Sequence, residues 1–158
     1  MSDISQRPNR IPWPPLVYLA GIAVSIFLGI LYPLPWFGPP LEDMLFAASF
    51  LVFAAVIAID VSAMRTMAKA KTTIMPNKGS EHLVMTGPFS FTRNPIYLAN
   101  TLLLVAGGLI TGNVWFFILA LICAFVTQKL AIEREERHLE ARFGKRYRDY
   151  AKRVRRWI

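Results

Sequence analysis

No charged residue occurs between Ile96 and Val126, a stretch of 31 residues. A bilayer core of roughly 30 Å is crossed by about 20 helical residues, so this stretch is too long for a single crossing. The turn-forming residues Thr111-Gly112-Asn113 interrupt it. The stretch therefore predicts a tight hairpin of two membrane helices, at about 95–111 and 114–132.

Two more uncharged stretches precede the hairpin, Leu16–Tyr32 and Met44–Ile59. Each fits one crossing with some flanking residues, which predicts spans at about 14–33 and 43–64. The first stretch is longer than the apolar region of a signal peptide, and no small-x-small cleavage site follows it, so we expect a retained helix. The chain of 158 residues, 54% of them hydrophobic, is thus predicted to be a single all-α polytopic membrane domain with four transmembrane helices.

The distribution of basic residues predicts the orientation of these helices. The chain has 18 Lys and Arg against 10 Asp and Glu, a formal net charge of +8, and no basic residue lies in the 32–43 or 111–113 turns. By the positive-inside rule, both termini and the loop between spans two and three are expected in the cytoplasm, with the bacterial inner membrane as the location. Because the positive charge follows this topology, anionic membrane lipids are the expected partners and nucleic acid is not. The oligomeric state is left open.

Two cytoplasmic segments contain enough polar residues to form a site. The first is the loop before span three, which ends in GPFSFTRNPIY at 87–97, a turn rich in proline and aromatic residues. The second is the tail 133–158. We expect span four to continue as a helix to Arg142 and to end at Gly144. An amphipathic helix is expected to follow, with an apolar stripe of Tyr147, Tyr150, Val154 and Trp157 lying on the anionic membrane surface.

Acidic residues at the end of span four allow two interpretations. Glu133, Glu135 and Glu136 stand where both the helix dipole and anionic lipid disfavour negative charge. One interpretation is local pairing, of Glu133 with Arg137 and of Glu136 with Arg142. The other is that Glu135 and Glu136 face the loop and hold a cationic ligand. No metal site is predicted, because Cys123 is a single cysteine, and His82 and His138, the latter expected on a solvated helix face, lack metal-ligand spacing.

The ordered motifs EHLVMTGPFSFTRNPIYLAN, an apolar hairpin, and EERHLEARFGKRYRDYAKRV resemble a known superfamily of integral membrane enzymes. It is the isoprenylcysteine carboxyl methyltransferase and phospholipid methyltransferase superfamily. The resemblance covers about Thr72 to Val154, half of the chain, and the first two spans match in character only. It implies an S-adenosylmethionine-dependent methyltransferase whose cofactor lies at the cytoplasmic surface, between the loop and the last two helices.

The resemblance also implies which residues form the site. The candidate catalytic residues are Asn94, Tyr97 and Glu135, and Glu135 is expected to hold the amino-acid part of the cofactor. The candidate cofactor-binding residues are Glu81, His82, Leu83, Val84, Gly87, Phe89, Arg93, Asn94, Pro95, Ile96, Tyr97, Glu135 and Glu136. Methyl transfer is a direct displacement that depends more on alignment than on an acid or a base.

The methyl acceptor is expected to be lipidic, and its chemistry stays open. Superfamily members that methylate the carboxylate of a prenylated cysteine usually read Arg-His-Pro where this chain reads Arg93-Asn94-Pro95, and an arginine used toward their substrate falls on Ala131. Carboxyl O-methylation of an isoprenylcysteine-like acceptor is the leading interpretation. Phospholipid N-methylation and a non-catalytic module that binds lipid or a partner are the alternatives.

Overall fold

The computed structural model describes residues 13–70 and 82–158. The elements within these two ranges are all helical, which confirms the predicted class. They are α1 (Trp13–Leu31), α2 (Leu41–Lys69), the 3-10 turn η1 (Gly87–Ser90), α3 (Pro95–Thr111), α4 (Trp115–Thr127), the π-helical turn η2 (Gln128–Ile132), α5 (Glu133–Phe143) and α6 (Lys145–Arg153).

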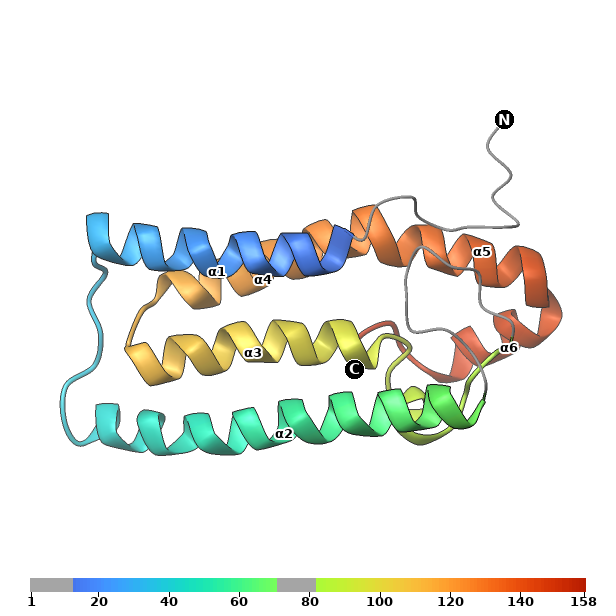
Figure 1. Ribbon diagram of the computed structural model, residues 1–158, viewed down its shortest axis with the longest axis horizontal. Coiled ribbons are helices and arrows are strands. Elements are labelled where there is room, and N and C mark those ends of the chain that lie inside the picture. The colour runs from blue at the N-terminus through green and yellow to red at the C-terminus, as the bar shows by residue number, and fades with distance from the viewer. Residues whose placement is uncertain (1–12, 71–81) are drawn as a thin grey trace.

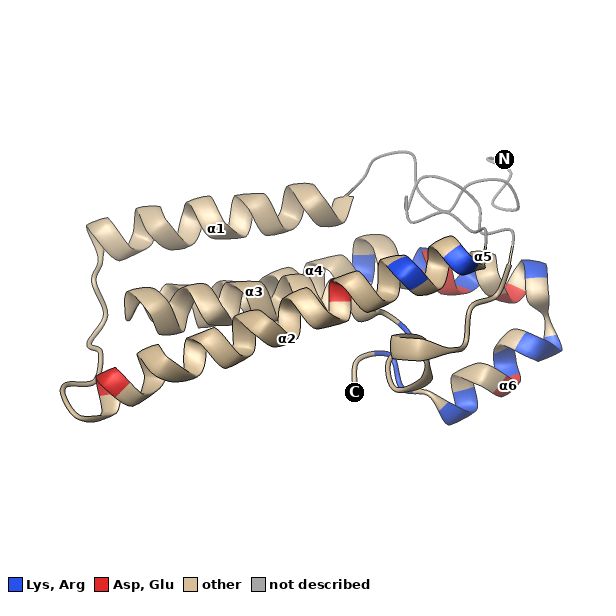
Figure 2. Cartoon of the chain, turned by 60° about the horizontal axis from the view of Figure 1, so that its bottom comes forward, with Lys and Arg blue, Asp and Glu red and all other residues tan. Residues whose placement is uncertain are grey.

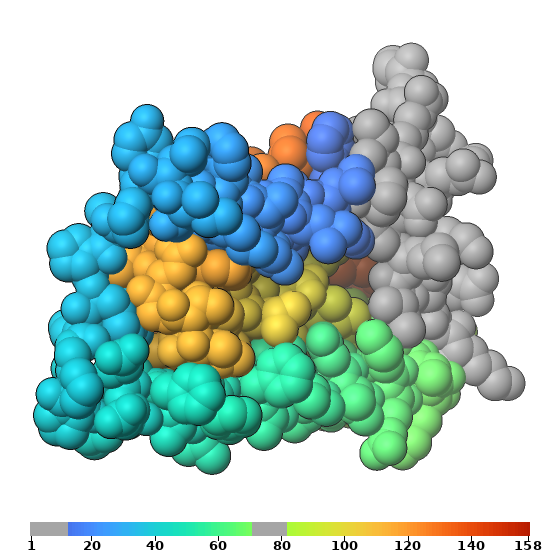
Figure 3. Space-filling view, turned by 60° about the vertical axis from the view of Figure 1, so that its left-hand side comes forward, coloured from blue at the N-terminus to red at the C-terminus, as the bar shows by residue number. Residues whose placement is uncertain are grey.

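The long helices form a bundle in which α3 packs between α2 and α4, and α1 packs against α4 (Figure 1). From one end, α1 and α2 are seen on either side of the α3–α4 hairpin (Figure 3). The core is a cluster of Tyr18, Leu104, Phe116, Ala120 and Cys123. Gly21 allows α1 to approach α4 closely, because a Cβ atom there would lie 2.5 Å from the Cys123 Sγ.

The outer surface of this bundle is apolar. Ile30, Leu51 and Leu121 each expose about three quarters of their surface, as expected for side chains that face lipid rather than water. Three helices in the described residues, namely α1, α2 and the continuous helix Trp115–Phe143, are long and apolar enough to cross a membrane, and α3 is a shorter apolar helix of 17 residues. Length and composition thus support three of the predicted spans directly.

The predicted helix limits hold to within a few residues, except that α2 continues to Lys69. The predicted helical extension of span four is also confirmed. The helix passes through η2, enters α5 and ends at Phe143, where Gly144 has a φ of +53°. Within α5, seven of the eleven residues in EREERHLEARF are Glu or Arg, so this segment lies beyond the apolar part of the span. Most charged residues in the described part of the chain gather at this end, on α5 and α6 (Figure 2).

The expectation that the apolar stripe of the last helix faces the membrane is wrong. In α6, Tyr147 and Tyr150 are only 4% exposed, and together with Val154 they pack against side chains of the loop and of α5, namely Leu83, Met85, Leu139 and Phe143. Trp157, the fourth member of the predicted stripe, lies beyond the end of the helix at Arg153. The apolar face thus finds a partner within the protein, and α6 closes the charged end of the bundle.

Candidate functional site

The loop before α3 is held against the end of α2. Gly87 has a φ of +61°, and a Cβ atom there would lie 2.6 Å from the Thr66 Oγ1. After η1, Thr92 is fully buried and its hydroxyl accepts a hydrogen bond from the Asn94 backbone N–H at 3.2 Å. Pro95 then begins α3, at a position where its fixed φ suits the first turn of a helix. The loop therefore presents Arg93, Asn94 and Tyr97 from a fixed backbone.

Tyr97 and Glu135 form the first contact of the site. The Tyr97 hydroxyl donates a hydrogen bond of 2.6 Å to Glu135 Oε1. The backbone of the same tyrosine is fixed from α1, because its carbonyl accepts a hydrogen bond from the Tyr18 hydroxyl at 3.2 Å. Within residues 13–70 and 82–158, neither Lys nor Arg forms an ion pair with Glu135.

The environment of Glu135 favours its neutral form. Burial raises the pKa of the Glu135 carboxyl to about 7, the Tyr97 hydrogen bond opposes this rise, and the negative charge of Glu136 adds to it. A carboxylate that is partly buried, next to another acid and without a cation has much to gain from a positively charged ligand. Perturbed carboxyl groups of this kind are typical of functional sites.

Glu136 has a different role, since it lies between two arginines. Arg156 binds it in a bidentate manner, with Nε at 2.9 Å from Oε1 and Nη2 at 2.7 Å from Oε2. Arg93 Nη1 lies 3.2 Å from Oε1 and also donates a hydrogen bond of 3.1 Å to the Tyr147 hydroxyl. The bond with Glu136 raises the pKa of Arg156, and burial raises that of Tyr147 to about 12. We call Arg93, Glu136 and Arg156 the arginine cluster; it carries one net positive charge.

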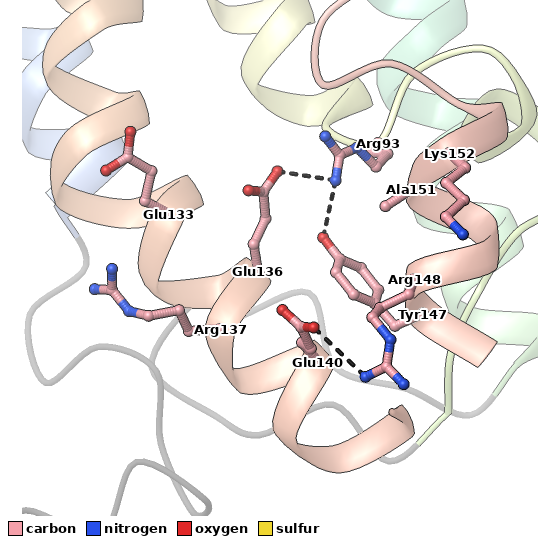
Figure 4. A pocket seen from close by; sticks show the side chains of 9 residues that line it. All are labelled: Arg93, Glu133, Glu136, Arg137, Glu140, Tyr147, Arg148, Ala151 and Lys152. Atoms are coloured by element: carbon pink, nitrogen blue, oxygen red, sulfur yellow. Dashed lines mark hydrogen bonds and ion pairs between the residues drawn. The ribbon is translucent and has the colours of Figure 1, made fainter. Parts of the chain in front are cut away.

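A pocket of about 510 Å³ opens beside the arginine cluster, between α5 and α6 (Figure 4). Its lining is mostly charged and consists of Arg93, Glu133, Glu136, Arg137, Glu140, Tyr147, Arg148, Ala151 and Lys152. Neither Tyr97 nor Glu135 is part of this lining. Consecutive residues of a helix point about 100° apart, so Glu135 and Glu136 serve different faces of α5, one toward α3 and one toward α6.

The structure brings some of the predicted site residues together and separates others. Asn94 lies beside the arginine cluster, and its Nδ2 donates a hydrogen bond to the Arg156 carbonyl at 2.9 Å. Pro95 is buried at the start of α3, followed by the partly buried Ile96.

The predicted site residues upstream in the loop are more dispersed. His82 is exposed, Val84 and Phe89 are partly buried, and Leu83 packs toward α6. The Phe89 carbonyl accepts a hydrogen bond from the Tyr150 hydroxyl at 2.7 Å. Glu81, also a predicted cofactor residue, lies outside the described residues.

Two predictions for α5 are wrong. Glu133 pairs with Lys129 at 2.7 Å and not with Arg137. His138 is 1% exposed and does not lie on a solvated face. Lys129 and Glu133 are i,i+4 neighbours, as Glu133 and Arg137 are, so Glu133 pairs with the basic residue one turn before it rather than one turn after. The π-helical turn η2 precedes His138, and an added residue within a turn rotates the helix that follows it. The apolar pattern of the sequence contains no signal for such a turn.

Comparison with known proteins agrees with this architecture. The model of a family described as phospholipid methyltransferase matches residues 44–146, which include most of α2, the loop, the α3–α4 hairpin and α5. The chain belongs to the phospholipid methyltransferase family. Membership of this family indicates a methyltransferase that acts at a membrane. A protein of Haemophilus influenzae, described as uncharacterized, is 40% identical over 63 residues, which are its whole length and 40% of this chain.

In this phospholipid methyltransferase family member, Arg156 contacts the candidate site residues Asn94 and Glu136, and Trp157 contacts Gln128; the sequence analysis named neither Arg156 nor Gln128. The Trp157 indole N–H donates a hydrogen bond to Gln128 Oε1 at 3.0 Å, and Arg156 completes the arginine cluster. The first contact joins Trp157 to Gln128 in η2, and the second joins Arg156 to Glu136 in α5. The matched region ends at residue 146, before Arg156, so the family pattern does not include it.

Proposed function

We propose that this protein transfers a methyl group from S-adenosylmethionine to a lipidic acceptor at the cytoplasmic surface of the membrane. The observation that supports this most is the carboxyl group of Glu135, held by Tyr97 and without a basic partner among the described residues. It lies one residue from an arginine cluster with one net positive charge. An anionic group on one face of α5 and a cationic cluster on the neighbouring face suit the two ends of a zwitterionic ligand.

The residues present fit the cofactor's amino-acid part. Its ammonium would pair with Glu135, and charge-assisted hydrogen bonds of this kind are about twice as strong as neutral ones. Its carboxylate would face Arg93, since Arg156 holds both carboxylate oxygens of Glu136. The Asn94 side-chain carbonyl would accept from a ribose hydroxyl, because the Asn94 amide nitrogen already donates to Arg156.

When bound, the cofactor supplies an activated methyl group, and the chain supplies alignment. Tyr97 orients the Glu135 carboxylate, and the prolines that flank the loop reduce the ordering cost of binding. The apolar helices leave a low-dielectric surface for the tail of the acceptor. If the acceptor is a carboxylate, charge is lost on the way to the neutral ester, which such surroundings favour.

Carboxyl O-methylation of an isoprenylcysteine-like acceptor is the reaction that we propose first. N-methylation of a phospholipid amine is the second candidate, favoured by the description of the matching family and by Asn94 and Ala131, where the chain departs from the carboxyl-methylating pattern. Both reactions use the same cofactor site and differ only in the acceptor.

We also propose four membrane crossings, with both termini in the cytoplasm and the bacterial inner membrane as the location. The helix α3 begins at the charged end and ends at Gly112, next to the start of α4 (Figure 1). Its packing between α2 and α4 supports a crossing of the same layer as these two helices. At about 1.5 Å per residue, its 17 residues reach roughly 26 Å, and local thinning of the bilayer would accommodate the remainder.

The deciding experiment incubates purified protein and bacterial membrane lipids with methyl-labelled S-adenosylmethionine, followed by lipid extraction and mass analysis. Label that mild base releases as methanol indicates an ester, and label that resists base indicates a methylated amine. Glu135→Gln should abolish most transfer. Glu42→Gln is the matched control, since Glu42 is exposed in the first turn of α2 and does not line the pocket beside the arginine cluster. Absence of both transfer and cofactor binding at millimolar concentration would contradict the proposed function.

A further inference from the structure

The last five residues of the chain, Val154–Ile158, follow α6 and cross back toward the start of α3 (Figure 1). We call this segment the C-terminal strap. Its backbone is extended at Val154, with φ −116° and ψ 126°. The strap lies between the two parts of the proposed cofactor site, because it contacts the loop on one side and η2 and α5 on the other.

Backbone carbonyls of the strap bind the loop. The Arg93 backbone N–H donates to the Arg155 carbonyl at 3.0 Å. The Thr92 hydroxyl and the Asn94 Nδ2 both donate to the Arg156 carbonyl, at 3.2 Å and 2.9 Å. Three consecutive loop residues are thus held by two consecutive strap residues.

Side chains of the strap bind the other wall of the site. Arg156 holds both carboxylate oxygens of Glu136, and Trp157 holds Gln128. By contrast, the side chain of Arg155 is exposed, and this residue contributes only its carbonyl. Arg156 is therefore the residue that links the loop to α5, through its carbonyl on one side and its guanidinium on the other.

These contacts are those of a fixed wall and not of a lid that opens. Thr92 is fully buried, and Glu136 and Arg93 expose only 17% and 15% of their side chains. Lifting the strap would remove the acceptor of the Thr92 hydroxyl and one of the two cations that neutralise Glu136. Leaving such groups buried and unpaired is costly.

We propose that the C-terminal strap is a permanent wall of the cofactor site and that Arg156 is a positioning residue within it. Arg156 holds the Asn94 side chain through its carbonyl and the Glu136 carboxylate through its guanidinium. Glu136 is thereby paired within the arginine cluster, and Glu135 alone binds the cofactor's ammonium. This inference rests on the proposed function for its ligand, whereas the wall itself is tested without any ligand.

The first test compares hydrogen exchange of the Arg93 backbone amide in the wild-type protein, Arg156→Gln and Arg155→Gln, each reconstituted in nanodiscs. Both variants remove one positive charge and leave every backbone carbonyl in place. We expect Arg156→Gln to speed exchange at Arg93 about tenfold and Arg155→Gln to leave it within twofold. Equal exchange in the two variants, or no change in either, would overturn the proposal even if the cofactor binds.

The second test measures the affinity for S-adenosylmethionine by calorimetry and separates KM from kcat. Arg156→Gln should weaken binding and raise KM about tenfold, with kcat at saturating cofactor within threefold of wild type. Arg156→Lys should recover part of this loss, because lysine keeps the charge without the bidentate geometry. Arg155→Gln should bind as wild type does.

A truncation after Val154 distinguishes a wall from a lid. A wall predicts weaker cofactor binding than in Arg156→Gln, since the contacts to Thr92, Asn94 and Gln128 are also lost. Tighter binding or faster turnover in the truncated protein would show an occluding lid and overturn the proposal. If the wild-type protein binds no S-adenosylmethionine while the exchange result holds, the proposed function fails and the wall stands.

Discussion

The Tyr97 hydroxyl donates a 2.6 Å hydrogen bond to Glu135, joining the first turn of α3 to α5 across 38 positions of sequence. The neighbouring Glu136 makes its contacts on another face of α5, with Arg93 and Arg156. Two consecutive glutamates thus differ in their partners: one has two cations, and the other has a neutral hydroxyl. This difference is the basis of the first three predictions.

Glu135→Gln should weaken binding of S-adenosylmethionine by about ten- to a hundredfold, the loss expected when a hydrogen bond to a charged group of roughly 1.5–3 kcal/mol is removed. Its effect on the free energy of unfolding should be small, because Glu135 has no ion pair among the described residues to lose. Calorimetric titration and thermal unfolding in detergent measure the two effects. Glu136→Gln is the comparison and should mainly lower stability, since it leaves two partly buried arginines without their carboxylate. Equal and negligible effects of both substitutions on affinity would remove the acidic pair from the site.

The affinity for the cofactor should rise with pH between 6 and 7.5. With a pKa of about 7, Glu135 is mostly neutral at pH 6 and mostly ionised at pH 7.5, and only the ionised form pairs with an ammonium. The ionised fraction and hence the affinity should increase roughly eightfold over this range. In the absence of ligand, the free energy of unfolding changes with pH in the opposite direction to the affinity. The folded protein holds this proton more tightly than the unfolded chain, so stability falls as the pH rises from about 4.5 to 7. Titrations at several pH values check this, and a slope that persists in Glu135→Gln would contradict it.

Tyr97→Phe should move the pH dependence of cofactor binding to higher pH. The Tyr97 hydrogen bond lowers the pKa of Glu135, so its removal raises that pKa and leaves less carboxylate at neutral pH. At pH 7 we expect affinity to fall about fivefold, as for the loss of roughly 1 kcal/mol. Tyr32→Phe is a control at the opposite end of the bundle, with a side chain that is 64% exposed. A loss of affinity without any shift in the pH midpoint would assign Tyr97 a role other than holding Glu135.

The fold was largely predictable because the bilayer imposes long uncharged helices, and charge marks where each one ends. The hairpin illustrates this, since α3 and α4 begin and end close to the limits set by Pro95 and by the turn at Gly112. In the site, Arg93, Tyr97 and Glu135 could be named from ordered motifs. The structure places Tyr97 on Glu135 and Arg93 on Glu136, and the roles of these residues stay predictions.

Other features depend on tertiary structure that no local pattern indicates. By composition, the apolar stripe on α6 suits a membrane surface and a protein partner equally. In the structure it packs against the loop and α5. Arg156 meets Glu136 only because the chain reverses at Gly144 and the strap returns past the loop. The π-helical turn η2 changes which residues of α5 face inward. The hydrophobic periodicity of the residues before this turn does not indicate the change.

Reporter fusions should place the C-terminus in the cytoplasm and an insertion at 111–113 outside it. This expectation follows from the 18 basic residues, all of which lie on the side assigned to the cytoplasm, and from four crossings. An alkaline phosphatase fusion is active only outside the cytoplasm, and a fluorescent protein fusion only inside, so the pair gives a positive signal for each side. An external C-terminus would exclude a cytoplasmic cofactor site. If both fusion points report the same side, α4 does not cross.

Gly87→Ala should lower the free energy of unfolding by about 1–3 kcal/mol, because alanine is strained at a φ of +61° and its Cβ atom would lie 2.6 Å from the Thr66 Oγ1. Gly38→Ala is the matched control, since no atom lies within 4 Å of a Cβ added there, and its stability should not change. Thermal unfolding in detergent measures both. Adding Thr66→Ala to Gly87→Ala removes the obstructing hydroxyl and should restore the part of the loss that comes from the contact and not from φ. Because Gly87 begins the turn that leads to Arg93 and Asn94, Gly87→Ala should also weaken cofactor binding. If stability falls while affinity stays at the wild-type value, the position of the loop on α2 does not determine the geometry of the site.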